Sequence, residues 1–385
     1  SGAKEDRALI RLHDVGIQIN HTEAGTPNFR IFVGGGMGRT PVIGKELRND
    51  IAPHQLLPYL QSVLRIYNLY GRRDHKYKSR IKILVNDLGL QQFKEKVEKE
   101  FCLIKDIELS ETLALVEKLK GHFPPPGEED AQIQPKEIAV QHPDFTLWVK
   151  NNVLPHKNSD LRNVMVSLKN IDTAPGNMTS SQMRIIASLS DRFSRGEIRV
   201  HHEQNLLLPS VSSNLLYDLW QGLKTADLSR PNVGQITDMI CCPGMDYCSL
   251  ANAETIPLAR ELNQQLAAIN PQQQAATIKL KVSGCMNACG HHHVGDIGIL
   301  GVDKKGEQWY QITLGGRGGI DAQLGTRMGP AVRRADIIQV LITLVETYHA
   351  LSFEKETFAQ TVERTGIEPF RERIYEKDRS TKHVA

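Results

Sequence analysis

An internal repeat constrains the fold more than any other feature of this sequence. Two segments far apart in the chain carry the same features in the same order: a strand-like run, a second run that ends in glycines, an amphipathic helix and a closing turn. In both helices the apolar residues recur at the spacing of one helix face. The matched segments, first copy against second, are 10–17 and 293–299, 29–36 and 310–318, 56–67 and 337–345, and 89–94 and 366–371. We therefore expect two copies of one structural unit, with strands at both runs.

The two copies differ in their cysteines and in what precedes them. Ala3 stands where Cys285 stands, and Arg7 stands where Cys289 stands, so only the second copy can bind a metal through sulfur. A further block, at 142–232, precedes the second copy and has no counterpart before the first. Since each copy should be one complete unit, we expect the first repeat to be truncated at its N-terminus, with roughly 150 residues upstream.

Shifts in composition divide the chain into four parts. A stretch rich in proline, glycine and acidic residues follows the first copy and is typical of a linker. Alternating strands and helices in the block after it indicate an α+β layer structure. The predicted parts are a cysteine-less unit at 1–118, a linker at 119–140, a block at 141–235 with strands at 161–168 and 197–208 and helices at 180–193 and 213–225, and a cysteine-bearing unit with a C-terminal tail at 236–385.

The cysteines are concentrated in one part of the chain, with five of the six between positions 241 and 289. Such a cluster in a chain of 385 residues is typical of metal binding or redox chemistry in a reducing compartment, so we expect a cytoplasmic protein. Cys102 stands alone beside Phe101 and Leu103, and we expect it to be a buried apolar filler. The net charge of +3 is too small to indicate nucleic acid, and no apolar run approaches the ~20 residues of a membrane helix.

Four cysteines form two closely spaced pairs. Cys242 and Cys248 are related as C-x5-C, and Cys285 and Cys289 as C-x3-C. Four thiolates match the ligand count of an iron–sulfur cluster, and neither spacing fits the C-x2-C pairs of zinc sites. The spacing favours the cluster, while a zinc site that also uses the histidines at 291–293 stays open.

The residues beside the two pairs suit a bulky cofactor. The small residues Gly244, Ala288 and Gly290 allow the backbone to approach such a group and to donate N–H groups to sulfide. Asn287 can donate a further hydrogen bond. Cys241 directly precedes a predicted ligand, and we expect it to pack against apolar neighbours because two adjacent cysteines rarely reach one site.

The cysteine motif at 242–253, with 285–290, resembles the signature of the siroheme-dependent nitrite and sulfite reductases. The segments 199–206, 33–39 and 72–82 also resemble parts of that family, so the resemblance covers essentially the whole chain. It implies an α+β fold in which ferredoxin-like domains and siroheme/[4Fe–4S]-type α/β domains form a pseudo-twofold repeat. The block at 141–235 is then the ferredoxin-like domain, and 236–385 the siroheme and cluster domain.

The resemblance also implies an activity and a ligand set. The family carries out the assimilatory six-electron reduction of sulfite to sulfide or of nitrite to ammonia, with ferredoxin or a flavoprotein as electron donor. By position, Cys242, Cys248, Cys285 and Cys289 are the cluster ligands. Cys289 matches the cysteine whose thiolate bridges the cluster to the siroheme iron.

Further residues match the family's site by position. Arg80 and Lys82 fall at its paired substrate-binding lysines, although Arg80 keeps the charge without a lysine's ability to give up a proton. Gln204 and Asn205 match positions near the macrocycle, and Asn287 lies within the second cysteine pair. One of the histidines at 291–293 is a candidate partner for a siroheme carboxylate.

Two other functions stay open at this stage. A zinc-stapled module could bind RNA through the basic run at 72–82, although such a run is usually a solvated face. The chain could also be an inactive fragment of the reductase. For the reductase, Lys82 favours sulfite slightly over nitrite, and we expect neither a nucleic acid nor a membrane as partner.

Overall fold

The computed structural model describes residues 5–105, 110–122, 142–268 and 277–381. It divides into two compact units, one of residues 1–129 with 318–324 and the other of residues 130–317 with 325–385. The predicted linker lies largely outside the described residues. None of the described helices is both long and apolar enough to cross a membrane.

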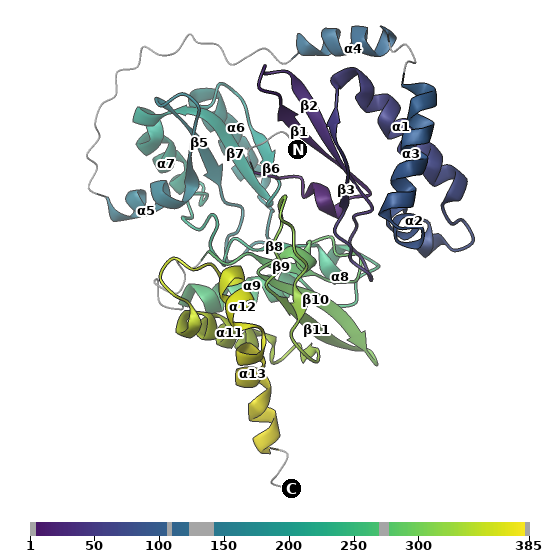
Figure 1. Ribbon diagram of the computed structural model, residues 1–385. Coiled ribbons are helices and arrows are strands. Elements are labelled where there is room, and N and C mark those ends of the chain that lie inside the picture. Colours follow the sequence, from purple (N-terminus) through teal and green to yellow (C-terminus); the bar gives the residue numbers. More distant parts are fainter. Residues whose placement is uncertain (1–4, 106–109, 123–141, 269–276, 382–385) are drawn as a thin grey trace. The chain divides into compact units, whose positions relative to one another are not determined.

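Unit 1 is a three-stranded antiparallel sheet with helices packed against it (Figure 1). Its strands are β1 (Val15–His21), β2 (Pro27–Val33) and β3 (Lys45–Ile51), in that order. Apolar residues of strands and helices form one core that includes Ile31, Val63 and Phe93. The helical elements are η1 (Ile10–Leu12), η2 (Pro53–Gln55), α1 (Leu56–Tyr70), η3 (Lys76–Lys78), α2 (Ile81–Leu88), α3 (Leu90–Ile104) and α4 (Ser110–Lys120).

The first part of unit 2 is a four-stranded antiparallel sheet in the order β4-β5-β7-β6. Helices cover it, and their apolar faces share a core with the strands around Trp148 and Trp220. The helix α6 begins at a capping box in which Thr179 and Gln182 satisfy each other's backbone N–H groups. The elements are α5 (Pro143–Asn152), β4 (Val153–Pro155), β5 (Leu161–Val166), α6 (Ser180–Phe193), β6 (Arg199–His201), β7 (Asn205–Ser212), η4 (Ser213–Leu215) and α7 (Leu216–Thr225).

The strand predicted at 197–208 is wrong, because the chain forms a hairpin there. β6 ends at His201, and β7 begins at Asn205 and pairs back on it. Gln204 adopts the left-handed conformation, with φ of 58°, which reverses the chain within three residues. The helix predicted at 213–225 is present, but its first turn is the 3₁₀ helix η4.

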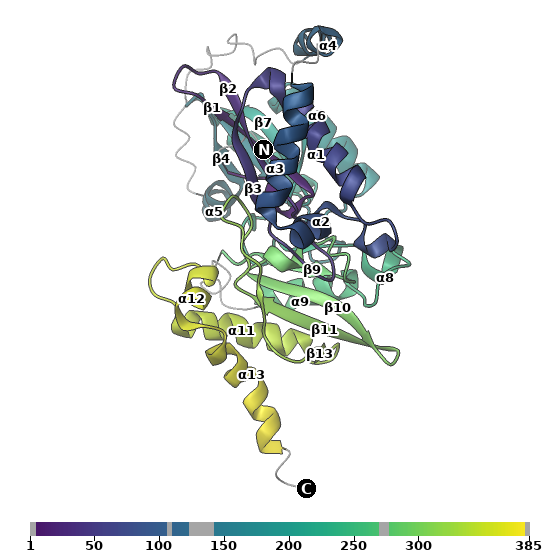
Figure 2. The same ribbon diagram turned by 45° about the vertical axis from the view of Figure 1, so that its right-hand side comes forward.

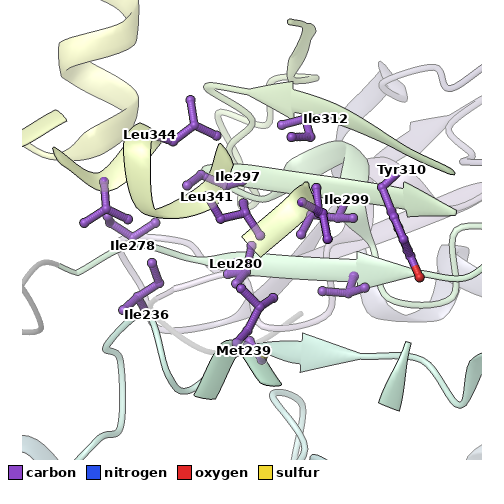
Figure 3. Packing of buried hydrophobic residues seen from close by; sticks show 14 of the residues in the cluster. Ile236, Met239, Ile278, Leu280, Ile297, Ile299, Tyr310, Ile312, Leu341 and Leu344 are labelled. Carbon is purple, nitrogen blue, oxygen red and sulfur yellow. The ribbon is translucent and has the colours of Figure 1, made fainter. Parts of the chain in front are cut away.

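The second part of unit 2 is a mixed sheet in the order β12-β11-β10-β9-β8, with β13 also paired to β11 (Figure 2). The strands β8, β9 and β10 run parallel, and β10–β11 is an antiparallel hairpin. Leu341 and Leu344 of α11 pack on Ile297 and Leu280 of the sheet, as Figure 3 shows. The elements are β8 (Ile240–Cys241), α8 (Gly244–Tyr247), α9 (Ile256–Ala268), β9 (Leu280–Ser283), η5 (His292–Val294), β10 (Ile297–Lys304), β11 (Glu307–Leu314), β12 (Thr326–Arg327), β13 (Val332–Arg333), α11 (Ile337–Leu351), α12 (Phe358–Thr365) and α13 (Glu368–Thr381).

The repeat is confirmed by backbone geometry that recurs between the copies. Gly34 donates its N–H to the Asp14 carbonyl at 3.0 Å, and Gly315 donates to the Asp296 carbonyl at 2.9 Å. The φ angles of these two glycines are 73° and 74°. Three further pairs share the left-handed region, namely Leu9 at 52° and His291 at 57°, Gly38 and Gly319 both at 99°, and Gly89 at 79° and Gly366 at 73°.

The left-handed residue at the start of each copy corrects the strands predicted at 10–17 and 293–299, because a 3₁₀ turn comes first and β10 starts only at Ile297. Leu9 turns the chain, so Ile10–Leu12 forms a 3₁₀ turn, and the first strand starts only at Val15. Gly16 lies against this turn, since a Cβ there would be 2.2 Å from the Ile10 carbonyl oxygen. In the second copy Gly298 lies in the same way against His292.

The prediction for Cys102 is wrong, because its side chain is exposed. The helix α3 buries Phe93, Val97, Phe101 and Ile104, which recur at three- and four-residue spacing. Cys102 follows Phe101 by one residue, and that step of about 100° turns it away from the core.

Candidate iron–sulfur site

The two cysteine pairs lie on loops at one edge of the parallel strands in unit 2. Cys242 follows β8 directly, and Cys285 follows β9 after one glycine. β8 and β9 are neighbours, with Cys241 opposite Val282, and the Cys242 N–H donates to the Val282 carbonyl at 3.1 Å. Because parallel strands end at the same edge, both loops meet there.

Glycines allow the two loops to press together. Gly244, at φ of 57°, leaves no room for a side chain, since a Cβ would be 2.1 Å from the Thr255 hydroxyl oxygen. A Cβ on Gly284 would lie 3.1 Å from the Gly244 Cα. The Gly284 N–H donates to the Cys242 sulfur at 3.0 Å, the kind of bond that stabilises a thiolate ligand.

The loop between Cys285 and Cys289 is a tight turn. Ala288 adopts φ of 58° and donates its N–H to the Cys285 carbonyl at 3.2 Å. Gly290 lies so close to β9 that a Cβ would be 2.0 Å from the Val282 carbonyl oxygen. Packing within the chain therefore accounts for the glycines at 244 and 290 without any cofactor.

The four cysteines of the two loops are free thiols that differ in exposure. Cys285 is buried, Cys242 and Cys248 are half-buried, Cys289 is exposed, and all are free thiols. Partial burial of the Cys289 sulfur, together with the charges of the other three cysteines, raises the pKa of this otherwise exposed residue. All four belong to the described residues, yet no three of their sulfurs lie within 4.8 Å of one another. Side-chain rotations would bring the sulfurs onto a metal centre, and four thiolates match the ligand count of a [4Fe–4S] cluster.

Cys241 packs in the core, as its position beside a predicted ligand suggested. Its side chain is buried in the apolar cluster of unit 2, and burial raises the pKa of its thiol to about 12. The thiol donates to the Cys242 carbonyl at 3.2 Å. A neutral, buried thiol of this kind is a poor metal ligand.

Gln204 and Asn205 connect the β6–β7 hairpin to the strand before Cys242. The Gln204 amide donates to the Cys241 carbonyl at 2.8 Å and accepts from the Cys241 N–H at 3.0 Å. Asn205 is buried and donates to the Asp238 carboxylate at 2.9 Å. Their cofactor-binding role stays a prediction, as does that of Asn287, whose side chain is exposed.

A buried ion pair that the sequence did not reveal joins the two parts of unit 2. The Lys169 ammonium lies 3.2 Å from the Asp238 carboxylate, and both side chains are almost fully buried. Lys169 also donates to the Glu203 carbonyl at 2.6 Å and to the Asn205 side-chain oxygen at 3.1 Å. Burial lowers the pKa of Lys169 and raises that of Asp238, and the attraction between them opposes both shifts.

Arg80 and Lys82, the predicted substrate-binding cations, belong to unit 1 and meet at its glycine turn. The Arg80 guanidinium forms two parallel hydrogen bonds to Asp14, at 2.9 and 2.8 Å. The Lys82 ammonium donates to the carbonyls of Met37 and Thr40, both at 2.8 Å. Burial and the charge of Arg80 lower the pKa of Lys82. The structure thus shows both cations held by the chain, and their catalytic role stays a prediction.

His292 is a buried polar residue at a position where the first copy has Ile10. The exposed fraction of His292 is 1%, and neither ring nitrogen has a hydrogen-bond partner among the described residues. Burial lowers its pKa to about 3, and the neighbouring histidines contribute. Ile10 is buried at the equivalent turn, which shows that this fold accommodates an apolar side chain there.

We expect His292→Ile to raise the free energy of unfolding of the cofactor-free chain by ~1–3 kcal/mol at neutral pH, because an unsatisfied buried group is removed.

The wild-type chain should also lose stability as the pH falls from about 6.5 towards 3. The folded pKa lies below the ordinary value, so the unfolded chain takes up a proton first. Urea unfolding across this pH range measures both effects. The reverse change, Ile10→His, should destabilise; a His292→Ile chain less stable than wild type would contradict the explanation.

The mixed sheets, the internal repeat and the four free thiols at the parallel strand ends define a protein of the α+β class with a candidate iron–sulfur site. The profile described as nitrite and sulphite reductase 4Fe-4S domain matches residues 1–103 and 233–383, and that of the nitrite/sulfite reductase ferredoxin-like half domain matches residues 165–226. This chain belongs to the nitrite and sulfite reductase family. The cofactors of that family are siroheme and a [4Fe–4S] cluster.

Individual relatives support the same family. The chain is 27% identical to a sulfite reductase [ferredoxin] of Mycobacterium tuberculosis over 92% of its own length and 59% of the relative's. It is 25% identical to an assimilatory ferredoxin-dependent nitrite reductase of Haloferax mediterranei, over 95% and 60%. The solved structure of the M. tuberculosis NirA protein matches with a TM-score of 0.70 and 26% identity, over 95% of this chain and 62% of that one. The chain thus spans about 60% of the length of these relatives.

Proposed function

We propose that this chain carries the cluster- and siroheme-binding part of an enzyme that reduces sulfite to sulfide or nitrite to ammonia. The observation that supports this most is the set of four free thiols on neighbouring loops at the strand ends of unit 2, within the part of the chain that matches the 4Fe-4S domain profile. Relatives named for both substrates match to a similar degree, so substrate choice is left to experiment. Their names also support ferredoxin as the electron donor.

In this proposal Cys242, Cys248, Cys285 and Cys289 hold the cluster. Cys289 is the exposed member of the set, so its thiol would be the one open to a second group such as siroheme. When bound, the two groups supply electrons one at a time to a substrate that stays in place. The chain's own contribution at the cluster is the Gly284 N–H, which stabilises the Cys242 thiolate.

The chain's contribution towards the substrate is the pair Arg80 and Lys82. Small oxyanions are bound by cations and hydrogen-bond donors, and both residues offer them. Asp14 fixes the Arg80 guanidinium, and the carbonyls of Met37 and Thr40 fix the Lys82 ammonium, so both charges are positioned in advance. Burial, which lowers the pKa of Lys82, makes it the better of the two as a proton donor.

A visible absorption spectrum of the chain, with iron and acid-labile sulfide measured on the same sample, tests the proposal. We expect a Soret band, a red-shifted chlorin band and about four labile sulfides per chain, the content of a [4Fe–4S] cluster. A colourless sample that contains zinc would instead favour the zinc-stapled module. A sample that takes up the cluster but no siroheme would point to a fragment that is inactive alone.

Substitutions of the two cations test their role in substrate binding. In the cofactor-loaded chain, Arg80→Ala and Lys82→Met should each weaken binding of sulfite or nitrite roughly tenfold or more, because a charge-assisted hydrogen bond contributes about 1.5–3 kcal/mol. Spectral titration of the siroheme band with each anion measures the dissociation constant. Arg72→Ala is the matched control, since Arg72 belongs to the same basic run but pairs with Asp74 in solvent. An equal loss of anion affinity in all three variants would mean that Arg80 and Lys82 contribute only general positive charge and no specific contacts to the substrate.

A further inference from the structure

The β6–β7 hairpin places three side chains of metal-binding type together, none of which belongs to the two cysteine pairs. One ligand atom each from His201, His202 and Glu203 lie within 4.8 Å of one another, and among the described residues only this group of histidine, cysteine and acidic side chains does so. We propose that these three residues form a binding site for a divalent transition-metal ion of the zinc class. No role in the reduction of sulfite or nitrite is needed to explain it.

The donor set selects this class of ion. Two imidazoles and one carboxylate are typical ligands of zinc and its neighbours, whereas magnesium and calcium prefer oxygen ligands alone. The His202 Nε2 and Glu203 Oε1 atoms are 4.0 Å apart. Ligands on one zinc ion at ~2.0–2.1 Å lie about 3.4 Å apart, so small side-chain rotations close the site. Three protein ligands leave a fourth position for water or another small ligand.

The backbone that carries the three ligands is fixed in advance. The Gln204 N–H closes the turn onto the His201 carbonyl at 3.2 Å, and the Gln204 side chain holds Cys241 by two hydrogen bonds. The buried Lys169 ammonium holds the Glu203 carbonyl at 2.6 Å. A metal ion therefore meets a turn whose main chain needs no reordering, which lowers the entropic cost of binding.

A lysine competes with a metal ion for the Glu203 carboxylate. The Lys279 ammonium lies 3.6 Å from Glu203 Oε1, on a side chain that is 59% exposed. Such a side chain can swing into solvent when a cation binds. The Glu203 N–H donates to His201 Nδ1 over a long 3.4 Å, a weak bond that a metal readily replaces.

An occupied site would clamp the hairpin that contacts the strand before Cys242. Gln204, the next residue after the three ligands, bonds to both backbone groups of Cys241. A metal ion that tightens the turn therefore stabilises the folded chain by mass action, and its effect on thermal stability grows with metal concentration.

Zinc titration of the chain against a chromophoric chelator tests the site. The titration uses two backgrounds: the cluster-loaded chain, whose cysteines are occupied, and the double variant Cys285→Ser, Cys289→Ser, in which one thiol pair is absent. We expect one zinc ion per chain in both. The double variant His201→Gln, His202→Gln should weaken this binding at least about tenfold, since two of three ligands are lost. Lys279→Ala should strengthen it, because a competing cation is removed.

His54→Gln is the matched control, since His54 is an exposed histidine in unit 1, and it should leave zinc affinity unchanged. Zinc should raise the melting temperature of the chain but not that of the His201→Gln, His202→Gln variant, whose melting temperature without zinc confirms that it folds. Equal affinity in wild type and this variant would overturn the site. Labile sulfide content, measured alongside, separates this outcome from failure of the cluster proposal, because the hairpin variant should keep it.

Discussion

Cys242→Ser should leave the chain without its cluster, whereas Cys241→Ser, one residue away, should retain it. After iron–sulfur reconstitution, labile sulfide in the Cys242 variant should fall from about four per chain to near zero, because a serine hydroxyl is a poor ligand for iron. Visible absorption and iron content should fall with it. The same loss is expected for Cys248→Ser, Cys285→Ser and Cys289→Ser.

Cys241→Ser is the matched control because Cys241 is the neighbour of Cys242 in the sequence but packs in the apolar core. Its thiol is buried and neutral and bonds to the Cys242 carbonyl, a contact that a serine hydroxyl can keep. We expect its free energy of unfolding to change by no more than ~1–2 kcal/mol. Loss of the cluster in the Cys241 variant, with retention in the Cys242 variant, would reverse the assignment of the two residues.

Sequence reasoning reached the repeat because its signals are local. Glycines at positive φ, helical apolar spacing and strand-like runs are each readable within about ten residues. The equal φ angles at Gly38 and Gly319 show that the copies share backbone geometry, although few of their side chains match. The repeat also explains what is unusual about His292, which only a comparison with Ile10 reveals.

The sequence misled where local patterns do not specify a turn or a face. The run at 197–208 is rich in strand-forming residues on both sides of its turn, and neither glycine nor proline marks the reversal at Gln204. Cys102 lies beside a buried phenylalanine, and only the phase of the whole helix shows that it faces solvent. No motif in the sequence marks His201, His202 and Glu203 as a site, because only the hairpin brings their ligand atoms together.

The pair Lys169 and Asp238 could not be predicted, because 69 residues separate them and no motif marks either. Because both side chains are almost fully buried, we expect the loss of one partner to have a large effect on stability. Lys169→Met should lower the free energy of unfolding by ~3–5 kcal/mol, since it leaves the Asp238 carboxylate buried without a countercharge. It also removes the donor to the Glu203 carbonyl. Urea unfolding at pH 7 measures the loss, and the exposed Lys150→Met, expected within ~0.5 kcal/mol of wild type, is the control.

The double variant Lys169→Met, Asp238→Asn distinguishes an ion pair from simple packing. Once both charges are gone, no buried charge is left unpaired, so the double variant should be more stable than Lys169→Met alone. If the losses in free energy of unfolding of Lys169→Met and Asp238→Asn simply add in the double variant, the two side chains do not interact. Because Asp238 and Gln204 fix the segment that leads into Cys242, Lys169→Met should also reduce cluster retention, and the double variant should recover part of it. If Lys169→Met lowers stability but retains the full cluster, the ion pair contributes to folding and not to the iron–sulfur site.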